Sequence, residues 1–174
     1  MDRKLLFVYN PKAGKALIKN KLADILDIFA DAGYETTVIP TRGQGDAAEA
    51  VAGRPGEYDL VVCSGGDGTL DEVVTGMIRS GFRTPIGYIP AGSTNDFGGS
   101  LSLPKNMVQA AEVVVNGWDF ACDIGSFSCN DVDDVFVYIA AFGIFTDVSY
   151  ETAQDMKNVL GHMAYLLEGM KRLS

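Results

Sequence analysis

One stretch of this chain, residues 60–76, constrains its fold more than any other. Leu60–Cys63 is a short apolar run of strand length, and the polar and glycine-rich segment Ser64-Gly65-Gly66-Asp67-Gly68-Thr69 follows it. From Leu70 onward the apolar residues recur with the period of a helix. The pattern predicts a buried strand, a glycine turn and the start of a helix. Free N–H groups and the helix dipole at such a start favour an anion, most often phosphate.

Asp67 is the unexpected residue of this loop. A carboxylate would repel a phosphate unless it serves a purpose, and holding a metal ion, directly or through water, is one such purpose. The alternative interpretation is a tight turn in which Asp67 only caps the helix.

Strands and helices alternate along the first two thirds of the chain, which predicts an α/β domain with a parallel sheet. The expected strands are 4–9, 34–39, 60–63 and 86–89, and the expected helices are one ending near 32, then 46–52, 70–80 and 104–115.

A second polar loop, residues 90–97, follows the strand at 86–89. It contains Gly92, the hydroxyls of Ser93 and Thr94, and the amide and carboxylate of Asn95 and Asp96. Ligands of open α/β sheets bind at the carboxyl ends of the strands, and both loops are expected there. Two such loops on one edge favour a binding site over two chance turns.

Consecutive strands replace the alternation after residue 117. We expect strands at 118–124, 127–129 and 135–141, a hairpin tip at 131–134 and an amphipathic helix at 158–173. The change predicts two domains, 1–120 and a partial β-rich domain at 121–174. The single histidine, His162, fits a surface or hydrogen-bonded side chain better than a catalyst.

Composition excludes some functions. The formal net charge of −9 argues against a nucleic-acid partner, because a phosphate-backbone binder needs a basic face. No apolar run is long enough to span a bilayer. The first residues lack the length and cleavage site of a signal peptide, so we expect none here. Cys63, Cys122 and Cys129 lack metal-site spacing, so we expect free thiols in a reducing cytosol.

The combination of motifs resembles the bacterial diacylglycerol kinase and lipid kinase family, which includes sphingosine and ceramide kinases. The matching pieces are Asn10-Pro11-x-Ala13-Gly14-Lys15, Thr41 before Gly45-Asp46-Ala47, Gly65-Gly66-Asp67-Gly68-Thr69-Leu70 with Glu72-Val73-Val74, Pro90-x-Gly92-Ser93-x-Asn95-Asp96-Phe97, Asp123-x-Gly125, and Lys157-Asn158-x-Leu160-Gly161 with Ala164-Tyr165. NAD kinases and phosphofructokinases share mainly the first glycine loop.

The resemblance implies a phosphofructokinase/NAD kinase-like nucleotide-binding domain followed by a β-rich lipid-binding domain. ATP, Mg²⁺ and a lipid alcohol such as diacylglycerol are the implied ligands. By position, the ATP contacts would be Asn10, Thr41, Gly65, Gly66, Asp67, Gly68, Thr69 and Ser93. Asp67, Asp96 and Asp123 would form a carboxylate cluster around magnesium and water.

Family members are usually much longer than 174 residues, which predicts that this chain is a fragment: a cloned piece, a truncated gene product or one half of a split protein. The family's catalytic base would lie in the missing part, so we expect weak or absent kinase activity from this chain. Apolar faces left without partner strands would favour oligomerisation. The implied location is the cytoplasm, with transient peripheral contact at a membrane surface.

Two other functions stay open on the sequence. One is an NAD kinase-like enzyme on the same scaffold, against which the segment Asn95-Asp96-Phe97 argues. The other is a non-catalytic nucleotide-binding or interaction module.

Overall fold

The computed structural model describes residues 3–129 and 132–137, all of which belong to one compact unit, Met1–Tyr138. The helix expected at 158–173 and His162 lie outside the described residues. The domain boundary expected after residue 120 stays a prediction, because most of the second domain also lies outside them.

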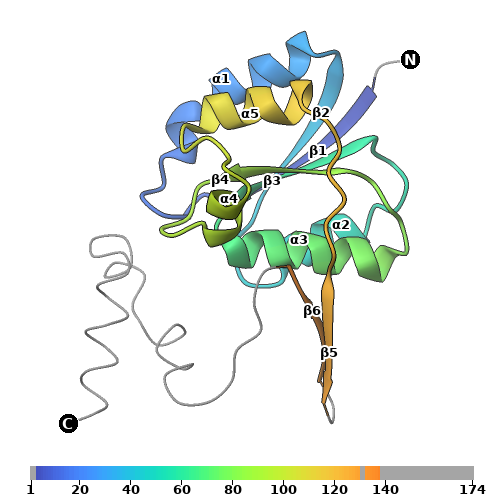
Figure 1. Cartoon of the computed structure of the whole chain (residues 1–174). Coiled ribbons are helices and arrows are strands. Elements are labelled where there is room, and N and C mark those ends of the chain that lie inside the picture. Colours follow the sequence, from blue (N-terminus) through green and yellow to red (C-terminus); the bar gives the residue numbers. More distant parts are fainter. Residues whose placement is uncertain (1–2, 130–131, 138–174) are drawn as a thin grey trace, which may run out of the picture. The chain divides into compact units, whose positions relative to one another are not determined.

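A four-stranded parallel sheet forms the centre of this unit, as the alternation of strands and helices predicts (Figure 1). Its strands are β1 (Arg3–Tyr9), β2 (Tyr34–Pro40), β3 (Leu60–Gly65) and β4 (Ile86–Pro90). The spatial order is β2-β1-β3-β4, and every neighbouring pair is parallel. All six residues of β3 are buried, as expected for a central strand covered on both faces.

Helices cover both faces of the sheet. They are α1 (Ile18–Asp31), α2 (Asp46–Ala52), α3 (Asp67–Ser80), α4 (Asp96–Ser100) and α5 (Met107–Asn116). Figure 1 shows α1 beside α5 on one face of the sheet, and α2 with α3 on the other. Alternate residues of β1 and β3 therefore enter two apolar clusters, with Leu6 and Val61 facing α2 and α3, and Phe7 and Val62 facing α1 and α5.

The helix predictions need correction at three points. Helix α5 begins at Met107, after the N-cap Asn106, and not at Pro104. Helix α3 begins at Asp67 and not at Leu70, so Gly68 and Thr69 belong to its first turn. Helix α4 was not predicted, because a five-residue helix with two glycines has little intrinsic helix propensity.

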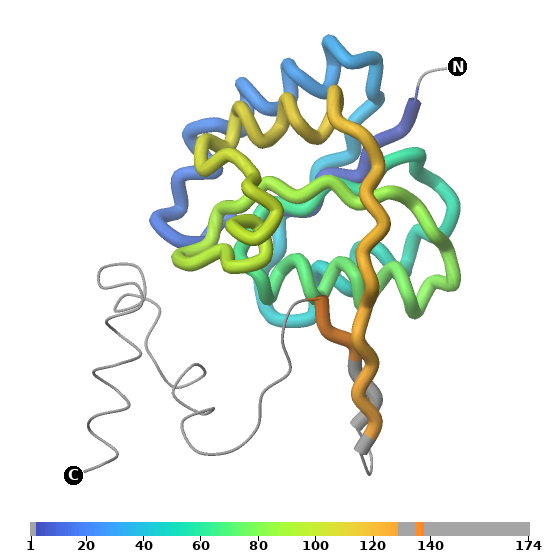
Figure 2. Tube along the Cα trace, in the orientation of Figure 1, coloured from blue at the N-terminus to red at the C-terminus, as the bar shows by residue number. Residues whose placement is uncertain are grey.

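The strand expected at Trp118–Ile124 is also wrong. These residues run from α5 to the next strand as an extended segment with no strand pairing in the described part of the chain (Figure 2). Trp118 is 91% exposed and Phe120 64% exposed, so most of the surface of both residues is open to solvent.

The predicted hairpin exists, with shifted bounds. Strands β5 (Gly125–Cys129) and β6 (Val132–Phe136) pair antiparallel, and Cys129 lies opposite Val132. Residues 133 and 134 therefore belong to a strand and not to the hairpin tip. The backbone N–H of Val137 donates to Asp71 Oδ1 at 3.2 Å, which ties the end of the hairpin to α3.

Candidate nucleotide-binding site

The strand order creates a crevice at the carboxyl edge of the sheet. The chain moves from β1 to β2 on one side and from β3 to β4 on the other, so the topology switches between β1 and β3. Ligands of open α/β sheets bind at such a switch point. Asn10 follows β1 here, and the glycine loop follows β3. The N–H of Asn10 donates to the Ser64 carbonyl at 2.8 Å, and Asn10 Nδ2 lies 3.5 Å from Thr69 Oγ1.

The glycine loop leads directly into α3. Gly66 is the N-cap residue of α3 and has no side chain to occupy the helix start. A Cβ on Gly65 would lie 2.5 Å from Thr69 Oγ1, so only glycine allows this tight turn. The resulting geometry presents a helix N-terminus at the switch point, where backbone N–H groups and the helix dipole favour an anionic ligand.

The two polar loops touch through their backbones. A Cβ on Gly92 would lie 2.5 Å from the Cα of Gly66, which leaves no room for a side chain between them. The N–H groups of Ala91 and Gly92 donate to the Gly65 carbonyl at 2.8 and 3.2 Å. Backbone hydrogen bonds thus hold the loop at residues 90–97 against the glycine loop, at the edge of the sheet where both were expected.

Asp67 connects the same loops through its side chain. Its Oδ2 accepts from the Asp96 N–H at 3.0 Å and its Oδ1 from the Phe97 N–H at 3.3 Å. The carboxylate therefore caps α4, a role that the sequence did not indicate. Burial raises the pKa of Asp67 above its ordinary value, these two hydrogen bonds act in the opposite direction, and the neighbouring Asp96 carboxylate raises it further.

The three carboxylates expected around magnesium are not equally placed. Asp67 and Asp96 are neighbours, and the Asp96 side chain is exposed. Asp123 is also exposed and lies in the segment that the structure shows as extended and unpaired. Within residues 3–129 and 132–137, no three carboxylate, thiol or imidazole groups come together as metal ligands. The structure thus joins two of the three carboxylates, and a three-carboxylate cluster is not formed in this part of the chain.

The other expected nucleotide contacts lie at the same edge. Thr41 directly follows β2, is buried, and donates its N–H to the Tyr9 carbonyl at 2.9 Å. Asp46 Oδ2 accepts the N–H groups of Arg42 and Gly43, which holds the loop after Thr41. Ser93 is exposed in the loop that follows β4.

Two residues that shape the site were missed as such. Asn95 is the N-cap of α4 and has a positive φ of 55°. Its Oδ1 accepts the Gly92 N–H, and its Nδ2 donates to the Gly92 carbonyl. Tyr88 in β4 places its hydroxyl 3.2 Å from the Gly65 carbonyl oxygen. Asn95 stood within a recognised motif, whereas Tyr88 reads in sequence only as one residue of a buried strand.

Ser64 supplies one further observation beside the glycine loop. Its side chain is fully buried, and its Oγ has no hydrogen-bond partner among the residues that the structure describes. Buried polar groups are normally paired, so an orphaned hydroxyl next to the switch point fits a site that takes a polar ligand.

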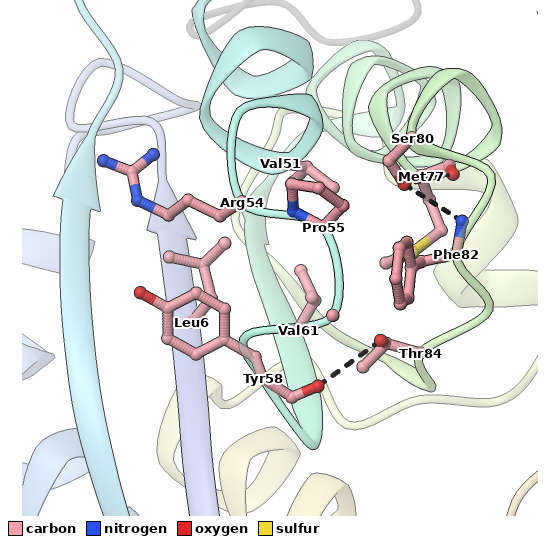
Figure 3. A pocket seen from close by; sticks show the side chains of 11 residues that line it. Leu6, Val51, Arg54, Pro55, Tyr58, Val61, Met77, Ser80, Phe82 and Thr84 are labelled. Carbon is pink, nitrogen blue, oxygen red and sulfur yellow. Dashed lines mark hydrogen bonds between the residues drawn. The ribbon is translucent and has the colours of Figure 1, made fainter.

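A small pocket lies elsewhere, at the opposite end of the strands (Figure 3). Tyr58 and Thr84 precede β3 and β4, and the Thr84 hydroxyl donates to the Tyr58 carbonyl at 3.4 Å. Val51, Met77 and Phe82 add apolar side chains to its walls. Its internal space of about 10 Å³ is about what one water molecule needs. The pocket is therefore not the candidate site.

Comparison with known proteins identifies the family that this chain resembles. The model of the diacylglycerol kinase catalytic domain matches residues 4–127. The diacylglycerol kinase of Staphylococcus epidermidis is 40% identical over 99% of this chain and 54% of its own length. That of Staphylococcus carnosus is 38% identical over 99% of this chain and 56% of its own length. This chain thus spans about half the length of the curated relatives it matches.

A solved structure supports the same similarity. A diacylglycerol kinase from Bacillus anthracis superposes with a TM-score of 0.61 at 30% sequence identity, covering 71% of this chain and 44% of that chain. The α/β fold expected from the sequence is confirmed by this structure and by the observed parallel sheet.

Proposed function

The chain belongs to the family of the diacylglycerol kinase catalytic domain, and on that premise we propose that it forms the ATP-binding part of a lipid kinase. The proposed reaction transfers the γ-phosphoryl group of ATP to the hydroxyl of diacylglycerol or a similar lipid. The observation that carries the proposal is the start of α3 at the switch point between β1 and β3, in backbone contact with the loop after β4.

The proposed nucleotide contacts are the residues at this edge. The turn at Gly65–Thr69 would receive the phosphates through its backbone N–H groups, because phosphoryl transfer depends on positioning and on neutralising charge. Asn10, Thr41 and Ser93 would complete the contacts from the three other loops. The orphaned hydroxyl of Ser64 and the close approach of Gly66 and Gly92 support a polar ligand here.

We also propose that Mg²⁺ accompanies the nucleotide. A bound magnesium ion would neutralise charge on the phosphates. Asp67 and Asp96 are the neighbouring carboxylates that would hold it. A contribution of Asp123 through water stays a prediction from the family resemblance, because the described residues form no three-carboxylate cluster. Each oxygen of Asp67 already accepts one N–H group, and a carboxylate oxygen has a second acceptor site.

The lipid side of the reaction is a proposal that rests on the family alone. A lipid substrate requires peripheral contact with a membrane surface, and a group must accept the hydroxyl proton. We assign that base to none of the described residues. In that same part of the chain, no helix has the length and apolar character needed to cross a membrane. Location in the cytoplasm and association of the chain with copies of itself stay predictions.

Calorimetry of ATP binding by the 174-residue chain, with and without Mg²⁺, tests the proposal. We expect binding that depends on magnesium and that weakens about tenfold or more in Asp67→Asn, because the substitution removes the charge that would hold the ion. Asp59→Asn is the matched control, since the Asp59 carboxylate lies at the amino end of β3 and accepts the Lys4 N–H. Absence of ATP binding, or equal losses in both variants, would contradict the proposal.

A further inference from the structure

Tyr88 occupies a central position between the two polar loops. The residue is 6% exposed, and its hydroxyl lies 3.2 Å from the Gly65 carbonyl oxygen and 3.4 Å from Asn95 Oδ1. Gly65 is the last residue of β3, whereas Asn95 is the N-cap of α4. One hydroxyl therefore faces the glycine loop and the loop after β4 at the same time.

The orientation of Asn95 follows from its other hydrogen bonds. The Gly92 N–H donates to Asn95 Oδ1 at 2.8 Å, and Asn95 Nδ2 donates to the Gly92 carbonyl at 2.9 Å. If the amide oxygen and nitrogen of Asn95 were exchanged, its NH₂ group would face the Gly92 N–H and its oxygen would face the Gly92 carbonyl, and both hydrogen bonds would be lost. Oδ1 is therefore the atom that faces Tyr88. Both neighbours of the tyrosine hydroxyl are then acceptors, and the hydroxyl proton is the donor that they share.

The raised pKa of Tyr88 keeps its hydroxyl protonated and able to donate. Burial raises its pKa far above the ordinary value, and the nearby charge of Asp67 raises it further. The phenol is therefore neutral and protonated. Its ring also packs near Phe97 of α4, with the ring centroids 6.4 Å apart.

We propose that Tyr88 is a positioning residue of the nucleotide site, whose hydroxyl sets the spacing between the glycine loop and the Gly92–Asp96 loop. The proposal rests on the proposed function, because the loops it positions are those assigned to ATP. Asn95 is the N-cap of α4, and Asp96 is the first residue of that helix. A shift of Asn95 would therefore move Asp96 relative to the glycine loop, which Gly92 approaches closely at Gly66. Tyr88 itself touches no reacting atom.

The substitution Tyr88→Phe removes only the hydroxyl and keeps the ring against Phe97. The Gly65 carbonyl and Asn95 Oδ1 each keep a backbone N–H donor but lose the hydroxyl that they share. Loss of that link between the two loops favours a shift of the Asn95 side chain. We expect the affinity for ATP with Mg²⁺, measured by calorimetry on the 174-residue chain, to fall about three- to tenfold. Tyr58→Phe is the matched control, because it removes a tyrosine hydroxyl at the opposite end of the strands.

A merely structural role would lower stability without changing affinity. Ile89→Val therefore serves as a second control, since it removes one methylene from a fully buried residue next to Tyr88 and leaves the polar network intact. We expect Ile89→Val to lower the melting temperature while its ATP affinity stays within twofold of the wild-type value. Affinity losses in Ile89→Val equal to those in Tyr88→Phe would overturn the proposal.

Nuclear magnetic resonance of ¹⁵N-labelled chain separates this inference from the proposed function. We expect the backbone amide signal of Gly92 and the side-chain amide signals of Asn95 to shift in Tyr88→Phe and to stay in place in Tyr58→Phe. Unchanged signals, or unchanged ATP affinity in Tyr88→Phe, would overturn the role of Tyr88. If the wild-type chain binds no ATP, the proposed function fails, and these signals still decide whether the hydroxyl positions the loop.

Discussion

Asp67 illustrates how a single carboxylate acquires two roles from its surroundings. It caps α4 through the N–H groups of Asp96 and Phe97, and it lies at the edge where a metal-bound phosphate is proposed. Half-burial disfavours its charge, while the two N–H groups favour it. A residue in this position balances folding against binding, because the charge that would attract a cation is costly in its absence.

The pH dependence of stability should report that balance. The folded state holds the Asp67 proton more tightly than the unfolded chain, because its pKa is raised on folding. This contribution to stability is fully present below the unfolded pKa of about 3.9 and is lost as pH rises through the folded pKa. We therefore expect the free energy of unfolding of the wild-type chain to fall, relative to Asp67→Asn, as pH rises through this interval.

Urea denaturation of both proteins, at a series of pH values that starts below the unfolded pKa, measures this difference. A difference that stays constant over the interval would show that folding does not raise the pKa of Asp67.

Helices α2 and α3 pack unusually closely, and the contact orders the edge of the site. A Cβ on Gly76 of α3 would overlap the backbone carbonyl of Ala48 in α2 and lie 2.9 Å from its Cα. One turn earlier in α3, Glu72 Oε2 accepts the N–H of Ala47 at 3.3 Å. Helix α2 begins just after the loop that carries Thr41, so α3 supports that loop as well as its own N-terminus.

The substitution Gly76→Ala should separate these helices. The backbone of Ala48 cannot move aside as a side-chain end could, so we expect a loss of about 1–3 kcal/mol in the free energy of unfolding. This is the net loss that remains after the gain of about 1 kcal/mol that alanine brings to a helix interior. Gly68→Ala, in the first turn of the same helix, has open space around its Cβ and is the matched control. Equal stabilities of the two variants in urea denaturation would contradict this account.

The unit as a whole has two apolar clusters, one on each face of the sheet, and an aromatic segment outside both. Residues 118–127 follow α5, and this segment contains the exposed rings of Trp118, Phe120 and Phe127. Association of the chain through exposed apolar faces was expected from the sequence, and this segment offers such a face. Its single tryptophan makes the expectation measurable.

Trp118 is the only tryptophan of the chain, and its side chain is exposed. We therefore expect its fluorescence maximum at the wavelength of an indole in water. We expect its fluorescence maximum to stay nearly unchanged on unfolding in urea, while circular dichroism reports the loss of helices. Acrylamide should quench it equally before and after unfolding. A blue-shifted maximum that moves toward longer wavelength on dilution would instead show that Trp118 is covered in an oligomer.

Local patterns in the sequence were sufficient for most of the elements. The apolar run at Leu60–Cys63 and the helical period after Leu70 identified β3 and α3, because burial of one face repeats with the geometry of the element itself. They failed at 118–124, where aromatic and apolar residues favour a strand that has no described neighbour to pair with. They also missed α4, whose cap comes from another helix.

The sequence by itself determined that a glycine turn and a polar loop follow two buried strands, and that their motifs resemble those of lipid kinases. Only the tertiary structure decided that β1 and β3 are neighbours, so that Asn10 meets Thr69 at the switch point. It likewise decided that Asp67 caps α4 and that Tyr88 lies between the loops. These contacts join residues that are distant along the chain, because strand order and packing bring them together. Local periodicity of the sequence indicates neither strand order nor packing.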